Sequence, residues 1–281
     1  MRFELDADQR DFTGALDALL ASADTVAVAR AWADGDHGPG LRLWSRLAEM
    51  GVTSLADEPV FLVLAFERLG YYAVPGPYVE SVAYHGNAGG IWTVAVLPHV
   101  PYALDADIAD EVYAGDERVS DVGQMHGSVD RTRRLFDVGA IEGPWSAQFD
   151  RAVLAVSAQL LGLGERVLAD SVTYVKQRKQ FGREIGSYQA IKHALADVRI
   201  ALDFARPLVY GAALGEITSS AAKVAAGDAA YLASRTGLQV HGAIGYTQEF
   251  DLSIWITKIR ALLTAWGTPA FHRARVLEGL R

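Results

Sequence analysis

The sequence contains no cysteine among its 281 residues. It can therefore form no disulfide bond, and it offers no thiolate as a nucleophile or as a metal ligand. Its seven histidines do not fall at the spacing of metal-binding helices, and neither a Gly-x-Ser-x-Gly nor a phosphate-loop pattern occurs. We therefore expect no metal site.

An excess of positive charge is missing as well. The chain carries 26 Lys and Arg against 34 Asp and Glu, a formal net charge of −8, which argues against nucleic acid as a partner. No apolar run approaches the ~18–20 uninterrupted residues that a membrane span needs. The acidic N-terminus lacks the basic-then-apolar layout of a signal peptide, so we expect a cytoplasmic location and no membrane span.

The pattern of apolar residues divides the chain into three parts. Helical spacing dominates the beginning and the end of the sequence, where several long amphipathic patterns with short connections are typical of an antiparallel bundle. In between, residues 91–97 resemble a strand, and residues 111–113 and 134–138 could form two more. We predict a mostly α protein with a small β region. The predicted domains are an N-terminal helical domain (1–88), a short β domain (89–145) and a C-terminal helical bundle (146–281).

Two clusters in the last part combine polar residues with glycine. Arg178-Lys179-Gln180-Phe181-Gly182 closes a long helical pattern, and Gln239-Val240-His241-Gly242 opens a turn roughly 60 positions later. A guanidinium can hold phosphate oxygens bidentately, and glycine lets the backbone approach a ligand closely. Each residue alone also has a structural interpretation, because basic residues and glycine are common at helix C-termini.

Taken together, the two clusters resemble the flavin-contacting signature of the acyl-CoA dehydrogenase C-terminal domain. The resemblance is strong over residues 150–268. It is moderate over residues 41–81, which look like the family's helical N-terminal domain. The family's middle β domain has loops with Thr-Glu-Pro-Gly-like and Trp-Ile-Thr-Asn-like runs that cover the flavin and the thioester, and residues 91–145 contain neither. The resemblance therefore implies an acyl-CoA dehydrogenase-like fold with a truncated middle domain and a C-terminal four-helix bundle.

Some actinobacterial members of that family pair a full-length subunit with a shortened one in an α2β2 assembly, and several of them act on steroid-derived CoA thioesters. This chain resembles the shortened subunit. The resemblance implies FAD as cofactor, an acyl-CoA as substrate and a full-length acyl-CoA dehydrogenase subunit as partner.

The resemblance also suggests roles for individual residues. Arg178 matches the arginine that contacts the flavin pyrophosphate of the neighbouring subunit, Phe181 would pack near the flavin, and Gln239 and the turn at Gly242 would present amide groups to the dinucleotide. The full cofactor-binding set is Arg178, Gln180, Phe181, Gln239, Val240, Gly242 and Thr268.

The usual catalytic glutamate is absent. In the family it stands directly before a Gly-Thr pair, and here that position is Trp266, followed by Gly267 and Thr268. Trp266 either fills the vacated pocket or belongs to the bundle core. The Ser-Gln-Ile-Gln run that often follows the Gly-Thr pair is also missing, and with it a glutamine that would contact the flavin.

A few family members place their base at the start of the long helix, directly before an arginine. Here those positions are Asp150 and Arg151. Dehydrogenation needs a carboxylate to take the proton α to the thioester, although aspartate has a shorter reach than glutamate. Aspartate is also a favoured helix N-cap. Asp150 is therefore a candidate base, a substrate-positioning residue, or only a cap or salt-bridge partner. We assign Arg151 to the substrate.

Three hypotheses follow. The chain is a subunit that completes the FAD site of a full-length partner in a heterotetramer that desaturates a CoA thioester, with a bulky acyl group such as a steroid side chain. Alternatively, it is a self-sufficient homo-oligomeric dehydrogenase that uses Asp150. The third hypothesis is a non-catalytic scaffold with the same fold.

Overall fold

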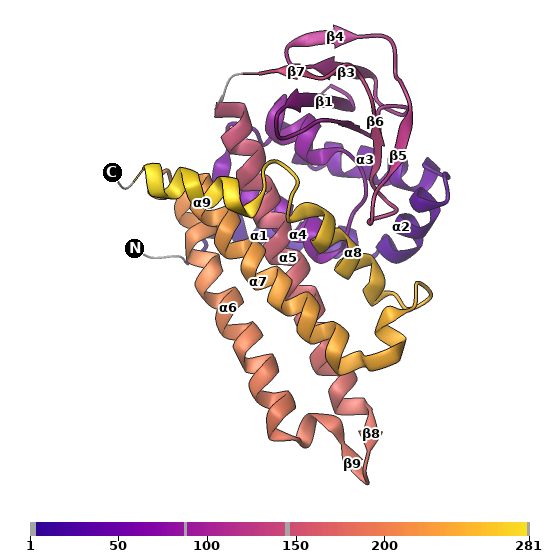
Figure 1. Cartoon of the computed structure of the whole chain (residues 1–281), viewed down its shortest axis with the longest axis vertical. Helices are drawn as coiled ribbons and strands as arrows, with labels where there is room; N and C mark the ends of the chain where they lie inside the picture. Colours follow the sequence, from indigo (N-terminus) through magenta and orange to yellow (C-terminus); the bar gives the residue numbers. More distant parts are fainter. Residues whose placement is uncertain (1–3, 87–88, 144–146, 280–281) are drawn as a thin grey trace.

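The computed structural model describes residues 4–86, 89–143 and 147–279. Helices occupy both ends of the sequence and a small β region lies between them, which confirms the predicted fold class. Figure 1 shows the C-terminal helices as a long column, with the β region at one end and a two-stranded hairpin at the other. The predicted domain boundaries at 88 and 145 fall on residues outside the described ranges.

The N-terminal part is built from short helices. A capping box between Asp6 and Gln9 starts the first of them. The apolar run 61–66 lies in a helix that begins with Pro59, and it is almost fully buried, as its composition predicts. The segments are α1 (Ala7–Ala21), α2 (Thr25–Ala33), α3 (Gly38–Glu49), η1 (Val52–Ser54), α4 (Pro59–Tyr71) and the π-helical η2 (Val79–Tyr84).

The β region forms two small sheets. Strand β1 (Trp92–Leu97) is central in the first sheet, of order β4-β3-β1-β7, and runs parallel to both neighbours. The predicted strands at 91–97, 111–113 and 134–138 correspond to β1, β3 and β6. The other strands of the two sheets are β2 (Ala103–Leu104), β3 (Glu111–Ala114), β4 (Glu117–Val119), β5 (Met125–Gly127), β6 (Arg134–Phe136) and β7 (Ile141–Glu142).

The C-terminal part is a bundle around one long helix. Helix α5 has 31 residues and packs against three other bundle helices as well as against α4. By length and composition α5 could cross a membrane, and so could α1 and α2 taken as one bent pair, but 83% of the apolar window of α5 is buried inside the protein. The elements are α5 (Ala147–Gln177), β8 (Lys179–Gln180), β9 (Arg183–Glu184), η3 (Ile185–Ser187), α6 (Gln189–Ala213), α7 (Ser219–His241), η4 (Gly242–Tyr246), α8 (Leu252–Leu262) and α9 (Pro269–Glu278).

Two glycines let α4 and α5 cross at close range. A Cβ at Gly162 would lie 1.9 Å from the carbonyl oxygen of Glu67, and a Cβ at Gly70 would lie 2.2 Å from that of Gln159. Both clashes are with backbone atoms, which cannot move aside without displacing a helix. The N-terminal helices are therefore seated directly on the bundle.

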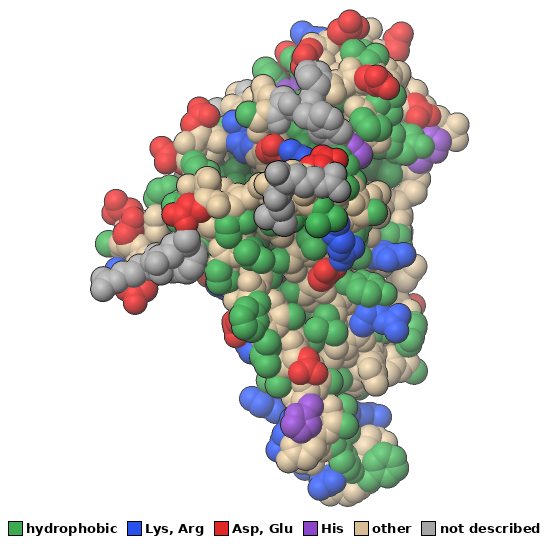
Figure 2. All heavy atoms as spheres, turned by 60° about the vertical axis from the view of Figure 1, so that its left-hand side comes forward, with side chains coloured by type: hydrophobic (Ala, Val, Ile, Leu, Met, Phe, Trp, Pro, Cys, Tyr) green, Lys and Arg blue, Asp and Glu red, His purple; other side chains and the backbone are tan. Residues whose placement is uncertain are grey.

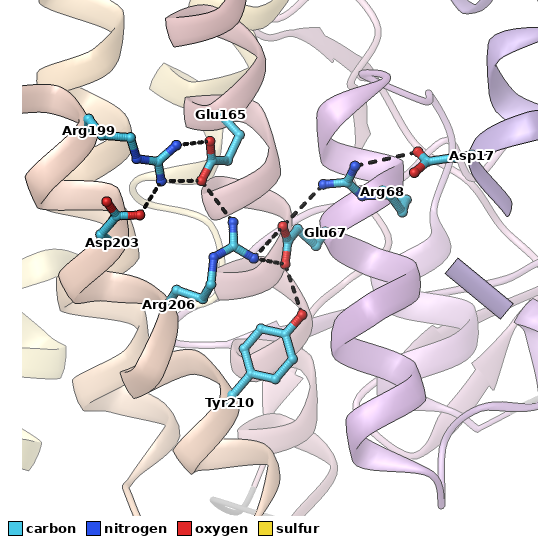
Figure 3. A network of polar contacts seen from close by, with 8 residues as sticks. All are labelled: Asp17, Glu67, Arg68, Glu165, Arg199, Asp203, Arg206 and Tyr210. Atoms are coloured by element: carbon cyan, nitrogen blue, oxygen red, sulfur yellow. Dashed lines mark hydrogen bonds and ion pairs between the residues drawn. The ribbon is translucent and has the colours of Figure 1, made fainter. Parts of the chain in front are cut away.

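A network of charged side chains joins the same two parts (Figure 3). The Arg206 guanidinium from α6 donates to Glu67 of α4 at 2.8 and 2.9 Å and to Glu165 of α5 at 2.8 Å. Arg199 donates two hydrogen bonds to Glu165, at 2.6 and 2.7 Å, and Tyr210 donates to Glu67 at 3.2 Å. The network thus connects α4 to the two consecutive bundle helices α5 and α6, which lie far from it in the sequence.

Candidate cofactor and substrate site

The first motif forms the protruding end of the bundle. Helix α5 ends at Gln177, and strands β8 and β9 form a hairpin that projects beyond the helices (Figure 1). Phe181 at its tip is 91% exposed and has a left-handed φ of 53°. The side chains of Arg178 and Gln180 are exposed as well. Among the described residues, Arg178 has no ion-pair partner, which leaves its guanidinium available to an anion.

The second motif lies at the same end. Helix α7 ends at His241, whose ring stacks on Tyr174, one turn before Arg178, with the centroids 4.2 Å apart. The same ring bonds to the carbonyl of Gly237 at 2.8 Å. This packing brings the exposed Gln239 and the turn at Gly242 (φ 65°) to the hairpin end. Val240 is 7% exposed and packs in the core.

The Trp266 position lies at the opposite end of α5. Its ring is 1% exposed and lies 5.7 Å from Phe149, in the first turn of α5, and 5.2 Å from Tyr84. From Asp150 to Arg178 the chain advances 28 residues, which at 1.5 Å per residue is about 42 Å. The predicted cofactor residues are therefore divided: six lie at the hairpin end and Thr268 lies at the other, too far away for one dinucleotide to contact both sets in a single chain.

The turn that holds Trp266 is anchored by two buried side chains. Trp266 has a left-handed φ of 58°, which is costly for a non-glycine residue. Lys223 donates to the carbonyls of Leu263 and Ala265 at 3.2 and 3.1 Å, and His272 Nε2 bonds to the carbonyl of Trp266 at 2.9 Å. Burial lowers the pKa of Lys223 to about 7 and that of His272 to about 4. The turn is thus rigidly fixed, and Thr268 is occupied as the N-cap of α9.

A cleft of about 490 Å³ opens beside Trp266, between the β region and the end of α8. Arg133 and Arg260 line it, and neither has an ion-pair partner within the described ranges. Glu80 lies behind Trp266 and is itself only 1% exposed. Burial raises the pKa of Glu80, although the charge of Arg133 and a side-chain hydrogen bond with Trp266 oppose the rise. Sequence reasoning missed Glu80. The available signal was a lone carboxylate in the run 78–84, whose only other polar aliphatic side chain is Ser81.

Asp150 lies inside the first turn of α5, not at its N-cap, because the helix begins at Ala147. Its carboxylate accepts hydrogen bonds from Arg275 at 2.7 and 3.2 Å and from Ser219 at 2.8 Å. Burial would raise the pKa of Asp150, but Arg275 and Ser219 hold it below its usual value. It is thus a salt-bridge partner, and a carboxylate with a lowered pKa is a weak general base.

Arg151 is engaged with the N-terminal helices. Its guanidinium donates to the carbonyls of Ala83 and Tyr84, the latter at 3.1 Å, and so closes the end of η2. Burial lowers its pKa. In the described part of the chain, no group of three or more His, Asp or Glu is placed to hold a metal ion.

The outer face of the bundle exposes several large apolar side chains. Figure 2 shows hydrophobic side chains spread down this face, with acidic and basic side chains between them. The exposed large apolar residues on α6 and α7 are Ile200, Phe204, Tyr231 and Leu232. Patches of this kind mark interaction surfaces.

Comparison with known proteins agrees with this architecture. Residues 145–280 match the family model described as acyl-CoA dehydrogenase, C-terminal domain. The acyl-CoA dehydrogenase IpdE2 of Mycobacterium tuberculosis is 30% identical over 85% of this chain and 87% of its own length.

Two solved structures share the fold at low sequence identity. The ChsE4–ChsE5 complex of Mycobacterium tuberculosis superposes with a TM-score of 0.79 at 20% identity, covering 100% of this chain and 99% of the other. A structure titled Tcur3481–Tcur3483 steroid ACAD, G363A variant, superposes with a TM-score of 0.79 at 19% identity over 97% and 98%. The match to IpdE2 extends over more than four fifths of both chains, and the chain therefore belongs to the acyl-CoA dehydrogenase family.

Proposed function

We propose that this chain is a subunit of a flavin-dependent acyl-CoA dehydrogenase and that its hairpin end completes the FAD site of a partner subunit. One observation carries the proposal. The exposed cofactor motifs lie together at one end of the bundle, about 42 Å from the Trp266 cleft at a rise of 1.5 Å per residue. A site that uses them must therefore take its remaining contacts from another chain.

The hairpin end has groups suited to a dinucleotide. The free Arg178 guanidinium would hold a pyrophosphate through its planar fork. Gln239 would present its side-chain amide, and Gly242 leaves its backbone open because it has no Cβ. Phe181, exposed at the tip, would cover an apolar part of the cofactor. The bound flavin would accept the hydride from the substrate.

The proton acceptor belongs to the partner in this proposal. Trp266 has no titratable group where the family usually has glutamate, and its side chain is held in place by Glu80 and by the anchored turn. Asp150 is paired with Arg275, with a lowered pKa. The self-sufficient alternative thus lacks an available base of raised pKa at Asp150. It predicts that Asp150→Asn abolishes turnover while flavin stays bound, whereas the subunit hypothesis predicts that turnover persists.

We further propose a heterotetramer that acts on a bulky acyl-CoA, such as a steroid side-chain thioester. The two structural neighbours support this choice, since one is a complex of two proteins and the other is a steroid ACAD. The apolar outer face of α6 and α7 would pack against the partner. The small β region would leave the thioester pocket wide.

The test is co-expression with full-length acyl-CoA dehydrogenases, with FAD per complex measured by visible absorption. Arg178→Ala should lower the FAD content, and Lys176→Ala, which removes an exposed cation close by at the end of α5, should not. Arg178→Lys should restore it only in part, because an ammonium lacks the fork. Equal FAD loading in all three variants would refute the assignment, and the chain purified alone should be colourless.

A further inference from the structure

Two arginines of the cleft beside Trp266 take no part in the function proposed above. Arg133 comes from the loop between β5 and β6, and Arg260 comes from the last turn of α8, so each side of the cleft contributes one guanidinium. Arg260 is exposed and Arg133 is half-buried, and over residues 4–86, 89–143 and 147–279 neither forms an ion pair. A free guanidinium binds carboxylates and phosphates through its planar fork.

The surroundings do not neutralise these two charges. The described residues that line the cleft include no Asp or Glu. The charge of Arg133 acts on two buried carboxyls, Glu80 and Asp105, but burial raises the pKa of both and so disfavours their ionised forms. Asp130, in the same loop as Arg133, is already bound to Lys258 at 2.9 Å. The cleft therefore carries a net positive charge, although the chain as a whole is acidic.

The rest of the cleft surface is mostly apolar. Val129 is 57% exposed, and the His99 ring stacks on Phe271 with the centroids 4.0 Å apart. Burial lowers the pKa of His99, so this ring is uncharged at pH 7. The volume of about 490 Å³ is typical of pockets that bind small molecules. The other apolar residues that line the cleft are Val100, Pro101, Leu135, Ala261 and Ala265.

We propose that the cleft binds an organic anion, a carboxylate or a phosphate ester, that has an apolar body. The charged group pairs with Arg133 and Arg260, and the apolar body lies against Val129 and Leu135. An uncharged thioester carbonyl would leave both guanidinium groups without a counter-charge, so the cleft is suited to a free acid. The site lies at the opposite end of α5 from the FAD contacts proposed above and does not depend on them.

The experiment is a titration of the purified full chain with hexanoate, with hexyl phosphate and with hexanamide, an uncharged analogue of hexanoate. The ¹⁵N resonances of Nε in Arg133 and Arg260 report binding, and their loss in Arg133→Gln and Arg260→Gln assigns them. We expect a saturable shift with at least one of the two anions and none with hexanamide. No saturable shift with either anion up to about 20 mM, above the millimolar range expected for such small ligands, would overturn the proposal. A shift of equal size and affinity with hexanamide would also overturn it.

A matched pair of exposed arginines tests the role of charge. Arg260 lines the cleft, whereas Arg235 on α7 is equally exposed and lies outside it. Arg260→Gln should weaken anion binding roughly tenfold, the scale of a lost interaction with a charged group, and Arg235→Gln should leave it unchanged. Equal weakening in the two variants would show attraction by general surface charge and would refute the site. Arg260 is exposed, so this comparison holds even if Arg133→Gln does not fold.

Shorter and differently charged ligands define the anion. Acetate should bind at least about tenfold more weakly than hexanoate, because it lacks four methylene groups that the apolar walls would bury. Equal affinities of acetate and hexanoate would contradict the assignment of the apolar walls. Tighter binding of hexanoate than of hexyl phosphate points to a carboxylic acid as the ligand, and the reverse order points to a phosphate ester.

Discussion

Arg206 connects two buried glutamates that lie on different helices, and its replacement by methionine should destabilise the protein strongly. Glu67 and Glu165 have side chains that are 5% and 13% exposed, and both accept from Arg206. Without the guanidinium, two carboxylates lose a shared partner at the junction of α4, α5 and α6. Glu67 retains Arg68 at 3.1 Å, and Glu165 retains Arg199.

The expected size follows from burial. Breaking a fully buried pair costs roughly 3–5 kcal/mol, while an exposed pair is worth about 0–1 kcal/mol. Arg206 is itself 36% exposed, so we expect Arg206→Met to lower the free energy of unfolding by about 3 kcal/mol, between those limits. For a chain of this size that corresponds to a fall in Tm of roughly 6–12 °C.

The assay is urea unfolding at pH 7, with Arg273→Met as the control. Arg273 pairs with Asp228, and both side chains are more than half exposed, so this variant should lose less than about 1 kcal/mol. Glu67→Gln in the Arg206→Met background should recover part of the loss, because it removes a buried charge. If Arg206→Met is no more destabilising than Arg273→Met, the reasoning from burial is wrong.

The same penalty should depend on pH. Burial would raise the pKa of Glu165, but Arg199 and Arg206 lower it overall. Its stabilising contribution is therefore complete above the carboxylate's ordinary pKa and is lost as the pH falls through the lowered value. The difference between wild type and Arg206→Met should be largest near neutral pH and should shrink in acid.

Other predictions concern packing, buried charge and Asp150. Gly162→Ala should destabilise the protein by about 1–3 kcal/mol, because the added Cβ meets the backbone of α4. Gly14→Ala, with open space around it, should stabilise the protein by about 0.5–1 kcal/mol. Thermal unfolding of the two variants measures both effects. Lys223 binds its proton more weakly in the folded state, with a pKa of about 7, so its contribution to stability rises between pH 7 and its ordinary pKa. Lys223→Met should remove that rise in urea unfolding across this range. Asp150→Asn should preserve turnover of the complex. It should lower the stability by about 1 kcal/mol, since the ion pair with Arg275 is half-exposed. Loss of turnover with normal stability and normal flavin content would instead make Asp150 the base.

Local patterns in the sequence account for most elements of the fold. The helical spacing of apolar residues predicts helices α4 to α8, and the apolar run at 91–97 predicts strand β1. Both predictions are possible because these signals depend only on residues close in the sequence. The motifs at Arg178 and Gln239 and the substitution at Trp266 were equally visible, since each is a short run of residue types. These features predicted the family that the comparisons show.

Contacts between distant residues decided the rest. The stacking of Tyr174 on His241 places the motifs at Arg178 and Gln239 side by side, and the length of α5 separates them from Trp266. Arg275 pairs with Asp150 across 125 positions, and Glu80 lies behind Trp266 although the two are far apart in the chain. Periodicity cannot reveal such pairings, because the partners of a buried charge or ring are set by how the helices cross. The sequence thus determined which chemical groups the chain carries, and the tertiary structure alone decided which of them are free to bind and which are already paired.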